Sequence, residues 1–133
     1  MDELVVKYYR RLCKNGFEYT GSMENPSIFL DTIGEKIRIC SHVSHAYIHI
    51  YINIRDNTID DIKYLCTCDP TANVVVEILC SLIKRKTIKE AEALTEESFS
   101  RALGSSGEDF LKKARGIIEL LHRGIARYKA SRT

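Results

Sequence analysis

The sequence lacks an apolar run long enough to cross a membrane, and it lacks a strong excess of charge of either sign. No segment approaches the ~20 apolar residues that a span needs. The N-terminal stretch "MDELVVKYYRRLCK" carries charges where a signal peptide has its apolar centre. Lys and Arg number 20 against 18 Asp and Glu, a formal net charge of +2. We therefore expect a cytoplasmic protein that binds neither membranes nor nucleic acid.

The sequence also lacks the common catalytic signatures. It contains no G-x-S-x-G, no H-E-x-x-H and no kinase-type motif, and "ALGSSGED" lacks the spacing of a phosphate-binding loop. Internal repeats and low-complexity segments are absent as well. The 133 residues suffice for one domain with a core of its own, so we expect a single domain over 1–133.

The hydrophobic pattern predicts a helix, a small sheet and then more helices. Residues 2–14 have helical periodicity, 16–36 is expected to be an ordered but irregular connection, and 43–54 and 58–65 alternate as two antiparallel strands. Asp69 and Pro70 are typical of a helix start, and that helix is expected to continue to about Lys86. Thr87 and Thr95 are expected to cap two shorter helices, and the last helix covers 108–128. This order predicts an α+β fold in which helices cover one face of the sheet.

Two cysteines stand at the start of the helix that Asp69 opens. Cys66 and Cys68 are at i and i+2, so in extended chain they point to the same side. The adjoining helix N-terminus should lower the pKa of both thiols. Cys40 and His42 have the same spacing near the preceding strand. If the strand ends meet, three sulfurs and one nitrogen converge, a set that suits zinc or an iron–sulfur cluster.

Simpler interpretations exist for each of these residues. Cys66 and Cys68 could be small buried hydrophobes, and Asp69 could be a cap alone. Cys80 is expected to pack in the core, and Cys13 shows no partner in the sequence. His45, His49 and His122 are expected to be solvated. The basic residues near the C-terminus, Lys113 among them, are expected to form the solvated face of the last helix.

Five stretches, taken in order, resemble the iron–sulfur cluster assembly scaffolds of the IscU and NifU N-terminal type. They are "ENP", "ICSH", "NTIDDIKYLC", "LIKRKTIKEAEAL" and "GIARY", and together they cover most of the chain. "ICSH" stands where that family has Cys-Gly-Asp, and "GIARY" resembles the end of its last helix. The resemblance implies that family's fold, with an antiparallel sheet of about three strands packed against several helices.

The resemblance also implies a ligand set, with departures. Cys40 matches the family's first cysteine, and His42 falls on its aspartate. Counting back without gaps places the second cysteine on Asp69, and a shift of one residue makes Cys68 the match. The third falls on Lys113, which has no thiol, so Cys66 could restore the count of three. Asp69 therefore stays either a helix cap or an alternative ligand.

The resemblance implies a scaffold or carrier without turnover of its own. Its cargo would be a [2Fe–2S]-type cluster or iron, with zinc as the alternative. A cysteine desulfurase-type donor would supply sulfur, and apo iron–sulfur proteins would accept the cluster. The family's Leu-Pro-Pro-Val-Lys stretch is replaced by "GEDFLKK", which puts recognition by its chaperone in doubt. Two other hypotheses remain open: thiol-redox or sulfur-transfer chemistry at Cys66 and Cys68, and a metal-free interaction module.

Overall fold

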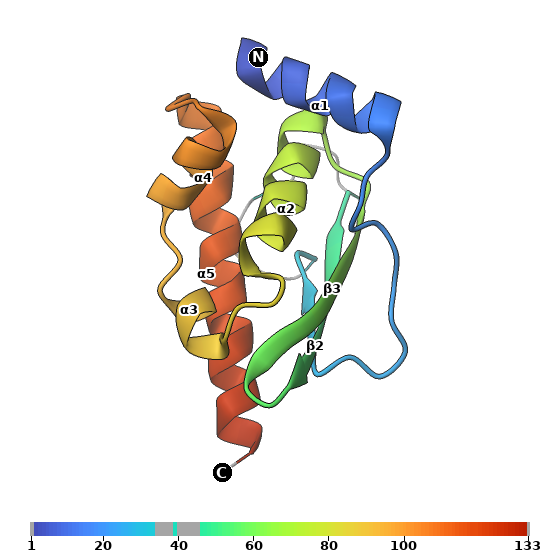
Figure 1. Cartoon of the computed structure of the whole chain (residues 1–133), viewed down its shortest axis with the longest axis vertical. Helices are drawn as coiled ribbons and strands as arrows, with labels where there is room; N and C mark the ends of the chain where they lie inside the picture. Colours follow the sequence, from blue (N-terminus) through green and yellow to red (C-terminus); the bar gives the residue numbers. More distant parts are fainter. Residues whose placement is uncertain (1, 34–38, 40–45, 133) are drawn as a thin grey trace.

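The predicted α+β architecture, a small antiparallel sheet against several helices, is confirmed. The computed structural model describes residues 2–33, 39 and 46–132. Strands β1, β2 and β3 form one antiparallel sheet in that order, and α2 and α5 pack against it (Figure 1). The elements in chain order are α1 (Glu3–Asn15), β1 (Ile28–Asp31), β2 (Ile48–Arg55), β3 (Thr58–Cys66), α2 (Pro70–Ile83), α3 (Ile88–Glu92), α4 (Glu96–Leu103) and α5 (Glu108–Ser131).

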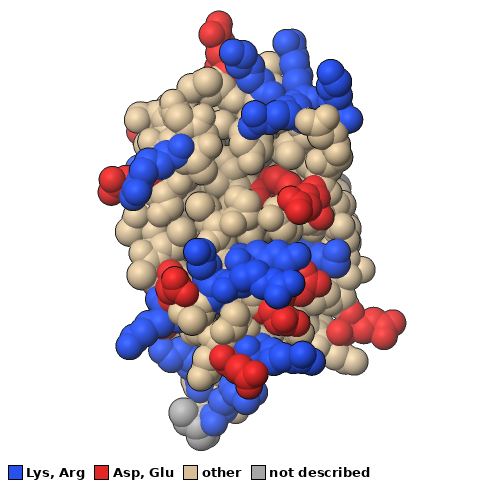
Figure 2. All heavy atoms as spheres, in the orientation of Figure 1, with Lys and Arg blue, Asp and Glu red and all other residues tan. Residues whose placement is uncertain are grey.

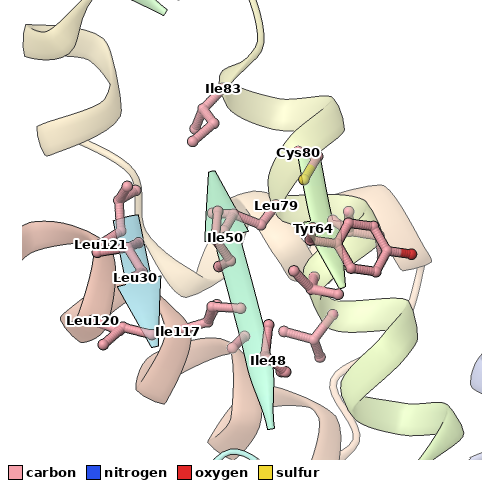
Figure 3. Packing of buried hydrophobic residues seen from close by; sticks show 14 of the residues in the cluster. Leu30, Ile48, Ile50, Tyr64, Leu79, Cys80, Ile83, Ile117, Leu120 and Leu121 are labelled. Atoms are coloured by element: carbon pink, nitrogen blue, oxygen red, sulfur yellow. The ribbon is translucent and has the colours of Figure 1, made fainter. Parts of the chain in front are cut away.

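The core lies between the sheet and the two helices α2 and α5. Along β2, buried and half-buried side chains alternate, as period 2 predicts, and Ile48, Ile50 and Ile52 face the helices. Figure 3 shows the strand side chains meeting residues of α2 and α5. Cys80 is fully buried there, so its predicted packing role is confirmed.

Strand β1 was not predicted, because it lies inside the expected irregular connection. It has four residues, of which only Ile28 and Leu30 are buried, and Pro26 stands two residues before it. Two alternating apolar residues are too few for a periodicity to be recognised. Strand β2 begins at Ile48, later than predicted, while residues 43–45 lie outside the described part of the chain.

The local signals around the other elements hold with one exception. Asp56 and Asn57 both have positive φ, 53° and 57°, so the predicted turn between β2 and β3 is confirmed. Thr87 forms a complete capping box with Glu90. Helix α4 begins directly after Thr95, but the Thr95 side chain makes no capping hydrogen bond. Helix α2 ends at Ile83, before the predicted Lys86, and Arg85 follows with a φ of 71°.

Two histidines that were expected to be solvated are partly buried instead. The His49 ring packs against the rings of Phe29 and Tyr47, and its Nε2 lies 3.3 Å from Asp31 Oδ1. His122 lines a cavity of about 520 Å³ between α5 and the start of α4. Within the described residues its buried Nε2 has no hydrogen-bond partner. Both predictions were wrong because neighbouring elements cover these positions; His45 lies outside the described residues.

Gly124 marks the closest approach of α5 to the sheet. A Cβ at this position would collide with Leu30 Cδ2 and would lie 3.3 Å from Ile28 Cγ2. Overpacking costs ~1–3 kcal/mol, whereas the better helix propensity of alanine returns only ~1 kcal/mol. We therefore expect Gly124→Ala to lower the free energy of unfolding by about 1 kcal/mol in urea denaturation.

A double-mutant cycle tests this close approach directly. Leu30→Val removes the Cδ atoms that a Cβ on Gly124 would meet, at a cost of its own of ~1 kcal/mol. The two substitutions together should cost less than the sum of the single costs. Strict additivity would show that α5 and β1 do not touch at Gly124.

Candidate metal centre at the start of α2

The candidate site is the junction where β3 ends and α2 begins. Strand β3 ends at Cys66, and Pro70 is the first residue of α2. The predicted cap is confirmed, since Asp69 Oδ1 accepts a hydrogen bond of 2.9 Å from the N–H of Ala72. The junction thus holds two cysteines and one carboxylate within four residues, next to the N–H groups of the first turn.

Cys66 does not have the predicted activated thiol. It pairs with buried Ile48 in the sheet register, is half-buried and packs against the core. Burial, with a smaller contribution from the negative charge of Asp69, raises the pKa of Cys66 to about 11. The N–H of Cys68 donates to the Cys66 sulfur and offsets only part of that rise. Loss of water thus outweighs the helix N-terminus, and the predicted lowering of the pKa is wrong for Cys66.

The two cysteines of the junction are in different chemical states. Cys66 is a free thiol, whereas Cys68 is half-buried and disulfide-bonded. Cys66 and Cys68 are therefore not bonded to each other. A metal ion binds thiolates, so any metal chemistry at Cys68 belongs to the reduced protein.

Lys113 does not lie on the solvated face of the last helix, as was expected of it. Its side chain is 11% exposed, and its Nζ lies 3.3 Å from Asp109 Oδ1 and 3.9 Å from Asp69 Oδ2. A buried ammonium group needs such carboxylate partners. Lys113 thus joins α5 to Asp69 at the start of α2.

The structure leaves part of the predicted ligand set without a position. Cys40 and His42 lie outside the described residues. In the described part of the chain, no three His, Cys, Asp or Glu side chains converge as a metal site. Of the predicted ligands, the structure describes Cys66, Cys68 and Asp69.

A buried carboxylate that the sequence reasoning missed holds the chain beside Cys66. Glu77 is 3% exposed and lies in the middle of α2. Its Oε1 accepts a 2.9 Å hydrogen bond from Tyr64 Oη, and its Oε2 accepts one of 3.2 Å from the N–H of Glu18. Burial raises the pKa of Glu77, although these hydrogen bonds oppose the rise. The available signal was a single acidic residue inside the apolar run "VVVEILC".

Known proteins resemble this chain in sequence and in fold. Over 79 residues it is 30% identical to the iron–sulfur cluster assembly scaffold protein IscU 1 of Archaeoglobus fulgidus, a match that covers 59% of this chain and 52% of that protein. IscU 2 of the same organism matches with the same figures. The chain thus spans about half the length of these curated relatives. A scan against protein-family models finds no match.

Two solved structures share the fold over nearly their whole length. The N-terminal NifU-like protein of Brucella abortus superposes with a TM-score of 0.63 at 11% identity, over 97% of this chain and 94% of that one. The putative SUF-system scaffold of Fervidobacterium islandicum AW-1 gives 0.61 at 14% identity, over 94% and 96%. In sequence and in fold, the chain resembles the IscU/NifU scaffolds.

The position of Lys113 bears on the resemblance to these scaffolds. The resemblance assigns the family's third cysteine to the position of Lys113, and the structure places Lys113 beside Asp69. A cation therefore stands next to the junction where the family pattern has a thiol. In the described part of the chain, no helix has both the length and the apolar character needed to cross a membrane.

Proposed function

We propose that this chain carries an iron–sulfur cluster, iron or zinc as cargo at the start of α2. Cys66 and Cys68 would supply thiolates, Cys40 a third, and His42 or Asp69 a further ligand. The observation that supports the proposal is the β3–α2 junction, where the Cys68 N–H contacts the Cys66 sulfur and Asp69 caps the helix. Cysteine thiolates are soft, anionic ligands for these metals, and a helix N-terminus stabilises their negative charge.

The two thiols would contribute in different ways. Cys68 stands at the mouth of the helix, and reduction of its disulfide would free it for binding. Cys66 keeps its proton near neutral pH, because its pKa is raised to about 11. Binding to Cys66 therefore releases a proton, so cargo affinity should rise with pH.

Sulfur would reach the site through a partner of the desulfurase type. A thiolate of this chain would attack the terminal sulfur of the partner's persulfide, and the partner's cysteine would leave as a thiolate. The chain would thereby gain a persulfide with no net oxidation or reduction. Apo iron–sulfur proteins would then accept the assembled cluster, and the chain would have no turnover of its own.

The dithiol alternative receives less support from the geometry. An attacking cysteine must be a thiolate, and burial keeps the Cys66 thiol protonated near neutral pH. Cys66 and Cys68 also stand in different states, one free and one disulfide-bonded. A metal-free interaction module on the same fold is an outcome of the test below.

Metal analysis of the reduced protein tests the proposal. The protein is purified without oxygen, and zinc, iron and acid-labile sulfide are measured per chain. We expect bound metal, and we expect Cys68→Ala to weaken zinc binding by about tenfold or more. Cys80→Ala is the matched control, because Cys80 is buried in the core away from the junction. If the native protein holds no metal and gives no chromophore after reconstitution with iron and sulfide, the metal proposal fails. The metal-free interaction module is then the hypothesis that remains.

A further inference from the structure

Helix α1 carries a row of four cations that make no ion pair with any residue that the structure describes. Lys7, Arg10, Arg11 and Lys14 are all exposed and recur at i, i+3, i+4 and i+7, so they share one face of the helix. The opposite face holds buried Val5 and half-buried Tyr8, Tyr9 and Leu12, which pack against the core. Figure 2 shows Lys and Arg gathered over α1, at the top of the view.

The row differs from three basic residues of α5, which are paired with carboxylates. Arg115 bonds Glu96 and Glu108, both at 2.8 Å; Arg123 bonds Glu119 at 2.8 Å, and Lys129 bonds Glu92 at 3.0 Å. In the described part of the chain, no ion pair joins the four α1 cations to a carboxylate. Arg11 only stacks over the ring of Tyr8, at 4.8 Å. The whole chain has a formal net charge of only +2, so this row is a local concentration of positive charge.

The row lies close to the candidate metal centre. Helix α1 packs across α2, whose first turn begins four residues after Cys66 (Figure 1). A partner seated on α1 would therefore lie near the start of α2.

We propose that the outer face of α1 is the docking surface for a partner protein that presents a matching row of carboxylates. The four cations span about 10 Å along the helix, since seven residues rise 1.5 Å each. That length fits carboxylates at helical spacing on the partner. Electrostatic docking of this kind raises the association rate and weakens with salt.

Charge and packing favour a protein over the other polyanions. An amphipathic helix that binds a membrane inserts its apolar face, and here that face already packs against the core. A nucleic-acid site usually adds a wider basic surface, and the chain as a whole is nearly neutral. Only the idea that the partner exchanges cargo with the thiols rests on the proposed function. The charge complementarity between the row and the partner is independent of it.

Two variants of equal net charge test the proposal. The row variant replaces Lys7, Arg10, Arg11 and Lys14 by glutamine, and the control variant replaces exposed Lys86, Lys89, Lys112 and Arg127. The probe is a helical peptide with glutamates at i, i+3, i+4 and i+7, titrated at low and high salt while amide chemical shifts are recorded. Vesicles that contain phosphatidylserine and a short DNA duplex are tested in parallel.

We expect peptide-induced shifts over α1, and about tenfold weaker binding in the row variant only. Equal losses in both variants would overturn the proposal, because net charge alone would then explain them. Binding of vesicles or duplex without binding of the peptide would also overturn it, as would no binding at all. If the row variant loses its helical circular dichroism, the pair Lys7→Gln and Lys14→Gln replaces it. Zinc content is measured for every variant, so a failure of the metal proposal is seen separately.

Discussion

Replacing Lys113 by cysteine should tighten zinc binding to the reduced protein by about 100-fold, equivalent to about 2.8 kcal/mol. The Lys113 ammonium lies 3.9 Å from Asp69 Oδ2 and repels a divalent cation at the junction. The substitution removes that charge and adds a thiolate where the resemblance places the family's third cysteine. Competition with a chromophoric chelator gives the affinity, and the absorption of the cobalt-substituted protein reports the number of thiolate ligands.

Two further variants separate the contributions of charge and of ligation. Lys113→Met removes the ammonium without adding a ligand, so it should account for about tenfold of the gain. Lys112→Cys adds a thiol one residue away on an exposed position and should change nothing. If Lys113→Cys and Lys112→Cys have the same effect, α5 does not contribute to the site.

The fold could be predicted from the sequence because its signals are local. The alternating isoleucines of β2, the Asp69 cap, the capping box at Thr87 and the turn at Asp56 and Asn57 each depend on residues close in the chain. Strand β1 could not be predicted, because its four residues are stabilised by pairing with β2 and by packing of α5 at Gly124. Those contacts join segments that are distant in the sequence.

The position of the candidate site could be predicted from the sequence, whereas the pKa of Cys66 and the burial of Lys113 could not. The spacing of Cys66, Cys68 and Asp69 indicated a junction at a helix start, and the structure has that junction. The rule for thiols at helix N-termini gave the wrong direction for the pKa of Cys66, since its burial against the core is a tertiary effect. The burial of Lys113 could not be predicted for the same reason, because Asp69 reaches Lys113 only when α5 packs on α2.

Glu77→Ala should lower the free energy of unfolding by about 3 kcal/mol, because it removes the carboxylate that accepts hydrogen bonds from both Tyr64 Oη and the N–H of Glu18. The N–H of Glu18 would lose its acceptor, while Tyr64 Oη would keep only Asn73 Oδ1, at 2.9 Å. The segment that leads from α1 to the sheet is fixed at the same place, since Tyr64 exchanges backbone hydrogen bonds of 2.9 Å with Tyr19 and Gly21. Urea denaturation measures the loss, and Glu119→Ala, which breaks an exposed ion pair, should cost about 0.5 kcal/mol or less.

The pH dependence of Glu77→Gln gives a second measurement with a definite sign. The pKa of Glu77 in the folded protein lies above its ordinary value of 4.5, so the folded state binds more protons than the unfolded state as the pH rises from that value. The contribution of Glu77 to stability is therefore complete below pH 4.5 and is lost as the pH rises through the raised pKa. Glutamine does not titrate, so the stability advantage of the native protein over Glu77→Gln should shrink across that window.

The same carboxylate links stability to the candidate centre. Cys66 is half-buried two residues after Tyr64, and Tyr64 and Glu77 together hold the chain that follows α1, so loosening that segment should expose the thiol. In Glu77→Ala we expect Cys66 to react faster with a thiol reagent under conditions where the protein is still folded, while Glu119→Ala leaves the rate unchanged. A rate that stays at the native value in Glu77→Ala would show that burial of Cys66 does not depend on this anchor. The raised pKa of Cys66 would then have to come from its packing against the core alone.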